Sequence, residues 1–298
     1  MTVLITGGSG FIGQNVIKHF IQRHWDVTNV SRTHVGLQGL KDQVAVDLGK
    51  ENSVEKIQRN VSPCKYIIHC AANIDYNFDN PQVSSVNCLG FHQILQLARL
   101  WNVESVIYLS SIGVIGTPFL HPITELHPPN PKTAYHASKL YGEYLGLIAN
   151  TTGVPCAILR LSSPIGPGMP KRKIVSTFVS RACENKPLEI LGNGTRKQNY
   201  VDVRDISSAI EQCLTKSAHG IYNIGGSRCI SNLDLAKECI STLNSTSTIK
   251  YTNMIDVEEG VVWDISIEKA KRDLAYCPKY TLKQSISDIS VDYENFDH

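Results

Sequence analysis

The amino-acid sequence predicts an α/β protein, in which a doubly wound parallel sheet is followed by a smaller C-terminal α/β lobe. Two observations support this fold class. Over residues 1–162, short apolar runs alternate with segments whose apolar residues recur at helical spacing. Short apolar strands that alternate with helices are typical of parallel strands covered on both faces. After about residue 162, proline and glycine interrupt the pattern.

The first expected helix, Phe11–Arg23, carries Ile12, Val16 and Phe20 at the spacing of one helix face. It lies between two apolar strands, and this order repeats along the chain. The expected strands are Val3–Ile5, Val27–Val30, Val44–Val46, Tyr66–His69, Val106–Leu109 and Cys156–Leu161, and further helices are expected near Val54–Arg59, Pro81–Trp101 and Ala134–Asn150.

The residues after 162 are expected to form a looser unit. Pro164, Gly166 and Pro167 break the alternating pattern, and Gly192-Asn193-Gly194 predicts a tight turn. Helices are expected at Ile174–Asn185, Val203–Thr215, Asn232–Leu243 and Leu282–Tyr293. We therefore expect residues 1–162 to form the main domain, with segments near 201–223 returning to it. Residues 163–200 and 224–298 are expected to form the smaller lobe.

Composition limits the classes of partner. A formal net charge of +2 is too small to indicate a nucleic-acid or membrane-surface partner, and the longest cationic run, Lys171-Arg172-Lys173, is interpreted as a solvated loop. No stretch approaches the roughly 20 apolar residues of a membrane helix. The apolar start lacks the charged segment of a signal peptide, so a cytoplasmic location is expected.

Cysteine and histidine placement favours neither disulfides nor a metal site. The nine cysteines are scattered and include no Cys-x-x-Cys pair, which indicates free thiols in a reducing compartment. His121 and His127 flank Glu125, but Pro122 and Pro128 place them in a loop where nothing fixes ligand geometry. We expect no metal.

The segment Thr6-Gly-Gly-Ser-Gly-Phe-Ile-Gly13 predicts a nucleotide-binding turn between the first strand and the first helix. Gly7 permits the turn, Gly10 lets a pyrophosphate approach the backbone, and Gly13 lets the helix pack closely. Free N–H groups at the helix start then face the phosphates. In an alternating α/β chain this position makes dinucleotide binding by residues 1–162 the favoured interpretation.

The second strand indicates which dinucleotide binds. Proteins that bind NAD place a carboxylate at the C-terminal end of this strand, but Asp26 lies at its other end. The expected position reads Ser31-Arg32-Thr33. A guanidinium and a hydroxyl suit a 2′-phosphate, so NADP is favoured and NAD is the alternative.

Tyr135 and Lys139 are four residues apart on an expected helix, so they share a face. A nearby cation and a positively charged nicotinamide would both favour phenolate and so lower the pKa of Tyr135, and a lowering of about three units corresponds to roughly 4 kcal/mol. Ser110 and Ser111 end the strand at Val106–Leu109, at the sheet edge where such proteins bind ligands. Ser111, Tyr135 and Lys139 are therefore the candidate catalytic residues.

With these motifs, the chain resembles an extended short-chain dehydrogenase/reductase with a Rossmann fold, of the NAD(P)-dependent nucleotide-sugar epimerase/dehydratase group. The resemblance runs nearly end to end. Besides the glycine turn it rests on Asp47-Leu48, His69-Cys-Ala-Ala72, Asn87 with Gly90, Ser110-Ser111 with Gly116, Tyr135 to Lys139, Arg160 with Pro164 and Gly166, Tyr200-Val-Asp202 with Asp205, and Tyr222-Asn-Ile-Gly225.

The resemblance implies roles for individual residues. Ser111 and Tyr135 would contact the reacting oxygen, Lys139 would also hold the nicotinamide ribose, and Asp47 would bind the adenine amino group. Other implied cofactor contacts are Phe11, Ile12, Leu48, the backbone at Ala71-Ala72, and the loop Ser163-Pro164-Ile165, which also reaches the substrate. The helices containing residues 81–101 and 132–150 would form a four-helix contact in a homodimer.

The chain also departs from the family pattern. Val114-Ile115-Gly116 stands where relatives have Val-Tyr-Gly. Ser163 replaces an asparagine that often binds the substrate diphosphate, and Gln198 replaces a phosphate-binding arginine. Arg196 or Lys197 could supply that charge. Ser163, Arg196 and Gln198 are therefore candidate substrate contacts, although these changes weaken the identification of a nucleotide sugar.

The favoured function is NADPH-dependent reduction of a keto group on a nucleotide-diphosphate sugar, a 4-keto-6-deoxyhexose, in deoxysugar biosynthesis. The alternatives are an NAD(P)-dependent 4-epimerase, a reductase of a small non-sugar ketone, and a dinucleotide sensor without catalysis. Trp25, Trp101 and Trp263 are interpreted as packing residues, and Asn87 and Glu125 as structural hydrogen-bonding residues.

Overall fold

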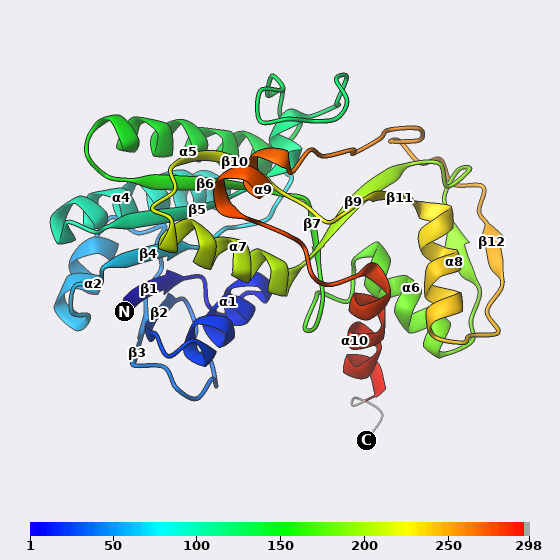
Figure 1. The fold of residues 1–298 in the computed structure, drawn as a ribbon, viewed down its shortest axis with the longest axis horizontal. Helices are drawn as coiled ribbons and strands as arrows, with labels where there is room; N and C mark the ends of the chain where they lie inside the picture. The colour runs from blue at the N-terminus through cyan, green and yellow to red at the C-terminus, as the bar shows by residue number, and fades with distance from the viewer. Residues whose placement is uncertain (295–298) are drawn as a thin grey trace.

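The structure, a computed structural model, describes residues 1–294 and is built on a seven-stranded parallel sheet (Figure 1). The strand order is β10-β6-β5-β4-β1-β2-β3, so the chain reverses direction across the sheet between β1 and β4. The strands are β1 Thr2–Thr6, β2 Asp26–Ser31, β3 Asp42–Ala45, β4 Tyr66–His69, β5 Ser105–Ser111, β6 Cys156–Leu161 and β10 Gly220–Ile224. This order confirms the predicted doubly wound sheet.

Helices cover both faces of this sheet. Ile5 of β1 packs in one core cluster and its neighbour Leu4 in the other, because successive side chains of a strand point to opposite faces. The first cluster lies under α1 Phe11–Gln22, α7 Val203–Thr215 and α9 Glu268–Leu274, and the second under α2 Ser53–Asn60, α4 Gly90–Trp101 and α5 Ala134–Thr151. In the described residues, no helix has the length and apolar character needed to cross a bilayer.

The helix expected over Pro81–Trp101 is interrupted. Between α3 (Pro81–Ser84) and α4 the chain forms a π-helical turn, Ser85–Leu89, which contains the buried Asn87. The Asn87 side chain accepts from the backbone N–H of Asn73 at 2.7 Å and donates to Ser138 Oγ at 2.9 Å. As predicted, Asn87 is a buried hydrogen-bonding residue, and it joins the segment after β4 to α5.

The smaller lobe contains two short sheets, placed on the right of Figure 1. Its core includes Val179, Leu188 and Leu235. The lobe strands are β7 Ser163–Ile165, β8 Leu188–Ile190, β9 Lys197–Asp202, β11 Cys229–Ser231 and β12 Ile249–Tyr251, and its helices are α6 Ile174–Cys183, α8 Asn232–Thr242 and α10 Leu282–Glu294. These strands were not expected from the sequence, since most have only three residues.

The chain returns to the large sheet twice after residue 200. Helix α7 and strand β10 lie in the segment near 201–223 that was expected to return. Helix α9 also packs on β10, with Leu274 in the core of the large sheet and Lys269 Nζ donating to the Ile221 carbonyl oxygen at 2.6 Å. The assignment of all residues from 224 onward to the smaller lobe therefore does not hold for α9, whose seven residues show too short a pattern to predict.

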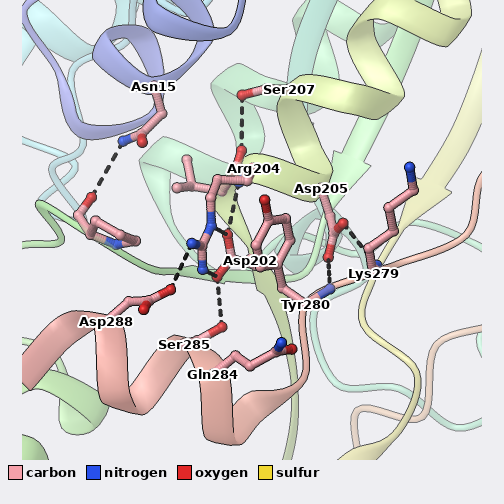
Figure 2. A network of polar contacts seen from close by, with 12 residues as sticks. Asn15, Asp202, Arg204, Asp205, Ser207, Lys279, Tyr280, Gln284, Ser285 and Asp288 are labelled. Carbon is pink, nitrogen blue, oxygen red and sulfur yellow. Dashed lines mark hydrogen bonds and ion pairs between the residues drawn. The ribbon is translucent and has the colours of Figure 1, made fainter.

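A polar network ties α10 to the start of α7 (Figure 2). Arg204 donates to both Asp202 oxygens at 2.8 Å and pairs with Asp288 of α10 at 2.6 Å. Ser285 Oγ donates to Asp202 at 2.6 Å, and the Tyr280 ring lies 3.7 Å from the Arg204 guanidinium. Because β9 ends at Asp202, this network fixes the junction between the two parts of the chain.

Candidate functional site

A single large cavity of about 960 Å³ contains every candidate site residue. It opens at the C-terminal ends of the sheet strands, where β1 leads to Gly7, β4 to Cys70 and β6 to Ser162, and its other wall is the smaller lobe. The candidates in its lining are Gly7, Gly10, Phe11, Ile12, Gly13, Ser31, Arg32, Asp47, Leu48, Ala71, Ala72, Ser111, Tyr135, Lys139, Ser163, Pro164, Ile165, Arg196 and Gln198. The volume suits a dinucleotide and part of a second ligand.

The glycine turn forms the cavity wall at the start of α1. Gly7 has a φ of +71°, and a Cβ there would lie 2.6 Å from the backbone of Ala71. A Cβ on Gly13 would overlap the carbonyl oxygen of Gly7. Helix α1 begins after Gly10 without a side-chain cap, so its first N–H groups remain free to donate. This backbone cradle fits the pyrophosphate of a dinucleotide.

Arg32 and Ser31 line the far end of the cavity, after β2. Ser31 is already engaged, since its hydroxyl donates to the Thr33 carbonyl oxygen at 2.6 Å and accepts from Asn29 at 3.1 Å. Arg32 is exposed and has no ion pair or hydrogen bond among residues 1–294. Opposite it, Asp47 uses Oδ1 to accept from the Gly49 N–H at 3.0 Å. The free guanidinium is the cation that this end of the cavity offers to a ligand.

The three candidate catalytic residues come from β5 and α5. Ser111 ends β5 and its Oγ accepts from the Gly113 N–H at 3.1 Å, which leaves its own proton available to donate. Lys139 Nζ donates to the Leu109 carbonyl oxygen at 2.8 Å and lies 5.9 Å from the centre of the Tyr135 ring. Helix α5 starts one residue before Tyr135, because Thr133 caps it by accepting from the His136 N–H.

The pKa of Tyr135 is raised in the structure, whereas a lowered pKa was expected. Burial raises the pKa of Tyr135, and the nearby Tyr76 phenol raises this pKa further. Burial has the opposite effect on a cation, and it lowers the pKa of Lys139 to about 8. The lysine alone does not bring the phenol pKa below its ordinary value, because desolvation disfavours both charged forms and Lys139 is hydrogen-bonded to β5 instead of to the phenol. The part of the expectation that depends on the nicotinamide stays a prediction. The phenol is therefore a proton donor at neutral pH.

Two residues beside Tyr135 were missed by sequence reasoning. The Tyr76 ring lies 6.0 Å from the Tyr135 ring in an edge-on arrangement, and 5.8 Å from the ring of His136. Both residues line the cavity, and burial lowers the pKa of His136. Tyr76 sits in a segment after β4 with no periodic pattern, so only tertiary structure brings it to Tyr135.

At the end of the cavity that the smaller lobe forms, Arg196 is paired with acidic residues and Lys197 does not line the cavity. Residues 196, 198 and 200 line the cavity from β9 and the residue before it, while Lys197 faces away because strand side chains alternate. Lys197 is therefore excluded as the phosphate-binding cation. Arg196 pairs with Glu258 and lies 4.0 Å from Asp256. The Gln198 amide oxygen, turned toward Arg196, accepts from its Nη2 at 2.6 Å.

Other basic residues line the same end. Arg181 pairs with Glu189 at 3.3 Å. Arg172 and Lys173, interpreted from sequence as part of a solvated loop, are exposed as expected but also line the cavity at the start of α6. Neither side chain has an ion pair within residues 1–294. Two residues of the cationic run, Arg172 and Lys173, therefore face the cavity as well as solvent.

The remaining predicted residues have structural surroundings. Trp25 is buried and Trp101 half-buried in the two sheet cores. Trp263 is buried in a small cluster but also lines the cavity, and its Nε1 has no hydrogen-bond partner in the described part of the chain. Glu125 accepts from the Asn223 N–H at 2.8 Å, a structural hydrogen bond as expected.

The described residues contain neither a disulfide nor a group of side chains that could bind a metal ion. No disulfide joins two cysteines of the described residues. No cluster of three or more His, Cys, Asp or Glu side chains within residues 1–294 could hold a metal ion.

Comparisons with known proteins place this fold and site in one family. A profile of the NAD dependent epimerase/dehydratase family matches residues 3–225. A protein of Methanocaldococcus jannaschii named "Putative UDP-glucose 4-epimerase" is 29% identical over 300 residues, covering 96% of each chain. The dTDP-D-glucose 4,6-dehydratase of Mus musculus is 28% identical over 266 residues, covering 84% of this chain and 75% of that protein.

Solved structures of proteins with epimerase and dehydratase names share the fold of this chain. The UDP-glucose 4-epimerase of Thermotoga maritima, solved with UDP-glucose, superposes with a TM-score of 0.86 at 24% identity, over 100% of this chain and 99% of that one. The dTDP-glucose 4,6-dehydratase of Bacillus anthracis, solved with NAD, gives a TM-score of 0.85 at 25% identity, over 99% and 97% of the two chains. The matched residues include the glycine turn and the Ser111, Tyr135 and Lys139 site. The chain therefore belongs to the NAD-dependent epimerase/dehydratase family, within the extended short-chain dehydrogenase/reductases.

Proposed function

We propose that this protein is an NADPH-dependent reductase of a keto group on a nucleotide-linked sugar, a 4-keto-6-deoxyhexose. The choice of NADPH as cofactor, and of reduction as the direction of the reaction, rests on one observation. Within the described residues, Arg32 lies unpaired in the cavity wall after β2. A planar guanidinium suits a 2′-phosphate, and no lining carboxylate follows β2 to bind ribose hydroxyls. A cofactor that is released after each turnover and replaced from the cell's pool of NADPH favours reduction.

The site residues support reduction through their protonation states. When bound, a nicotinamide dinucleotide supplies the hydride. Tyr135 is held as a neutral phenol because burial raises its pKa, so it can give a proton to the oxygen of the substrate carbonyl. The Ser111 hydroxyl, free to donate, can stabilise the negative charge that develops on the same oxygen. Lys139 holds a positive charge below its pKa of about 8.

The substrate class rests on the cations at the lobe end of the cavity. Arg172 and Lys173 line this end without ion pairs in the described residues, and Arg196 lies there in contact with Glu258. A diphosphate placed between them would find two unpaired cations. These side chains can supply the charge that is missing at Gln198, and they favour a nucleotide-linked sugar over an uncharged ketone.

An NAD-dependent 4-epimerase is the second candidate. It is favoured by the relatives, since the Methanocaldococcus jannaschii protein carries an epimerase name over nearly the whole length of both chains. The Thermus thermophilus UDP-glucose 4-epimerase, solved with NAD, has a TM-score of 0.84 at 24% identity. An epimerase reoxidises its own cofactor, so it would retain NAD and consume none.

One experiment separates these candidates. The purified protein is assayed for bound nucleotide after dialysis, then incubated with NADPH or NADH and a panel of nucleotide-linked 4-keto sugars. Stoichiometric loss of NADPH absorbance with formation of a sugar alcohol supports the reductase. Retained NAD with interconversion of 4-epimers and no net cofactor consumption replaces it with the epimerase. Turnover of simple ketones alone would reject a nucleotide-sugar substrate.

We also propose that the protein forms a homodimer through α4 and α5. Leu100 on α4 and Tyr144 and Ile148 on α5 are large apolar side chains with exposed fractions of 63%, 56% and 57%. Tyr141, Tyr144 and Ile148 follow one face of α5, at the spacing that a helix–helix contact uses. Light scattering on the eluting protein tests this, and an I148E variant should elute as a monomer.

A further inference from the structure

A buried ion pair lies directly behind the candidate catalytic residues. The Glu143 carboxylate on α5 accepts from Arg160 on β6, through Nε at 3.0 Å and Nη2 at 2.7 Å. The side chains are only 3% exposed for Arg160 and 2% exposed for Glu143. Neither residue lines the cavity, so neither can bind the substrate or the cofactor directly. Their effect must pass through the residues that they hold.

The pair holds the end of the strand that carries Ser111. Ser110, the preceding residue of β5, donates its hydroxyl to Glu143 Oε1 at 2.6 Å. Arg160 also donates Nη1 to the Glu125 carbonyl oxygen at 3.2 Å, in the segment that packs on β10. The two-bond fork and the Ser110 bond give the carboxylate one orientation, and the bond to the Glu125 carbonyl oxygen holds the guanidinium. The position of Ser111 therefore depends on a link between α5, β5 and β6.

Glu143, the acidic member of the pair, also lies near Lys139. Glu143 follows Lys139 by one helical turn on α5, so the two residues share a helix face. The other titratable groups that face Lys139 from the elements around it are His69, Cys70, Cys88, Tyr108 and Tyr135.

At pH 8 these other neighbours are neutral. Burial lowers the pKa of His69 to about 3 and raises the pKa of Cys70 to about 12. Burial also raises the pKa values of Cys88, Tyr108 and Tyr135 above their ordinary values. Glu143 differs from this set because it is ion-paired with Arg160, so the two opposite charges act together on Lys139.

We propose that Glu143 and Arg160 are positioning residues of this active site, which fix the end of β5 that carries Ser111 and set the charge experienced by Lys139. This inference rests on the proposed roles of Ser111 and Lys139. A structural ion pair alone would affect stability. A pair that sets the charge of a buried lysine must also change the pH at which that lysine titrates.

The test measures the titration of Lys139 in the cofactor-free protein. Protein labelled with ¹³C at the lysine ε-carbon is titrated by NMR, and the Lys139 signal is identified by its loss in K139M. We expect E143Q to lower the midpoint by about half to one pH unit, the effect of removing one nearby negative charge. R160M should raise the midpoint by a similar amount, because it leaves the Glu143 charge uncompensated.

The double variant E143Q/R160M separates charge from structure. Its midpoint should return close to that of the wild type, since both charges are removed. Replacing both members of a buried pair is tolerated better than replacing one, so this variant remains informative if a single variant does not fold. E55Q is the matched control, because Glu55 pairs with Arg59 on the exposed surface of α2. Its titration should match the wild type.

Activity gives the second readout. The alkaline limb of kcat against pH should move with the NMR midpoint, to lower pH in E143Q and to higher pH in R160M, while the limiting rate falls in both because Ser111 is less well held. Midpoints that do not move, or that move in the same direction in both single variants, would overturn the proposal. Shifted midpoints with an unaltered pH–rate profile would instead reject the role of Lys139 in the proposed function.

Discussion

The ammonium nitrogen of Lys139 lies 5.9 Å from the centre of the Tyr135 ring, one helical turn away on α5. The nitrogen is hydrogen-bonded to β5, through the Leu109 carbonyl oxygen at 2.8 Å. The lysine therefore contributes charge near the phenol while its own hydrogen bond is made to β5. Burial and the neighbouring Tyr76 raise the pKa of the phenol and keep it protonated, as reduction requires.

Replacing Tyr135 by phenylalanine should remove the proton donor and leave the shape of the cavity unchanged. We expect turnover to fall about 100-fold or more, the range seen when a general acid is lost. The affinity for NADPH, measured by quenching of its fluorescence, should stay the same, since Tyr135 lies beside the reacting atoms. Y76F serves as a control at the neighbouring ring. A rate of Y135F near that of the wild type would show that another group gives the proton.

Lys139 should make folding stability depend on pH. Its pKa is about 8 in the folded protein and about 10.4 when unfolded, so between these values the unfolded chain binds more protons and stability rises with pH. Relative to K139M, the wild type should gain about 2 kcal/mol of unfolding free energy between pH 7 and pH 10. Urea titrations of both proteins at several pH values measure the difference, and a constant difference would contradict the buried-lysine assignment.

Local patterns explain which parts of the fold could be predicted from sequence. The strands Tyr66–His69 and Cys156–Leu161 match the structure to the residue, because each has a short, fully buried apolar centre, Ile67-Ile68 in the first and Ala157–Leu159 in the second. Strands β7 and β11 have three residues each, too few to display a period. They form because β9 lies between them and pairs with both, which is a relationship between distant segments.

The site follows the same rule. The glycine turn and the Tyr135–Lys139 spacing are local, so sequence reasoning placed both in the cavity. The pairing of Arg196 with Glu258 joins the residue before β9 to a segment about 60 residues later and could not be predicted from either stretch alone. The sign of the pKa change at Tyr135 also needed the structure, since it depends on burial by residues such as Tyr76.

Arg204 should be important for folding stability because it supplies the positive charge that pairs with the buried Asp202 carboxylate. The Asp202 side chain has an exposed fraction of 0%, and Arg204 supplies two of its hydrogen bonds and a link to Asp288 of α10 (Figure 2). We expect R204M to lower the unfolding free energy by about 2 to 3 kcal/mol, because a buried carboxylate loses its cation. R228M is the control, since Arg228 is 68% exposed and pairs with Glu238 at 3.9 Å. Equal stability losses in the two variants, measured by urea unfolding, would contradict this role.

Replacing Arg32 by alanine should change which cofactor the protein prefers. Arg32 lines the cavity after β2, is exposed, and has no ion pair within residues 1–294, so its charge is available to a 2′-phosphate. A charge-assisted hydrogen bond contributes about 1.5 to 3 kcal/mol, so the dissociation constant of NADPH should rise about 10- to 100-fold in R32A. Binding of NADH, which lacks the phosphate, should change little, and the ratio of the two constants is the measured quantity. H34A, two residues further along the same segment, controls for disturbance of the loop. If R32A binds both dinucleotides as the wild type does, the cation does not read the phosphate, and the epimerase with a retained NAD becomes the better account of this site.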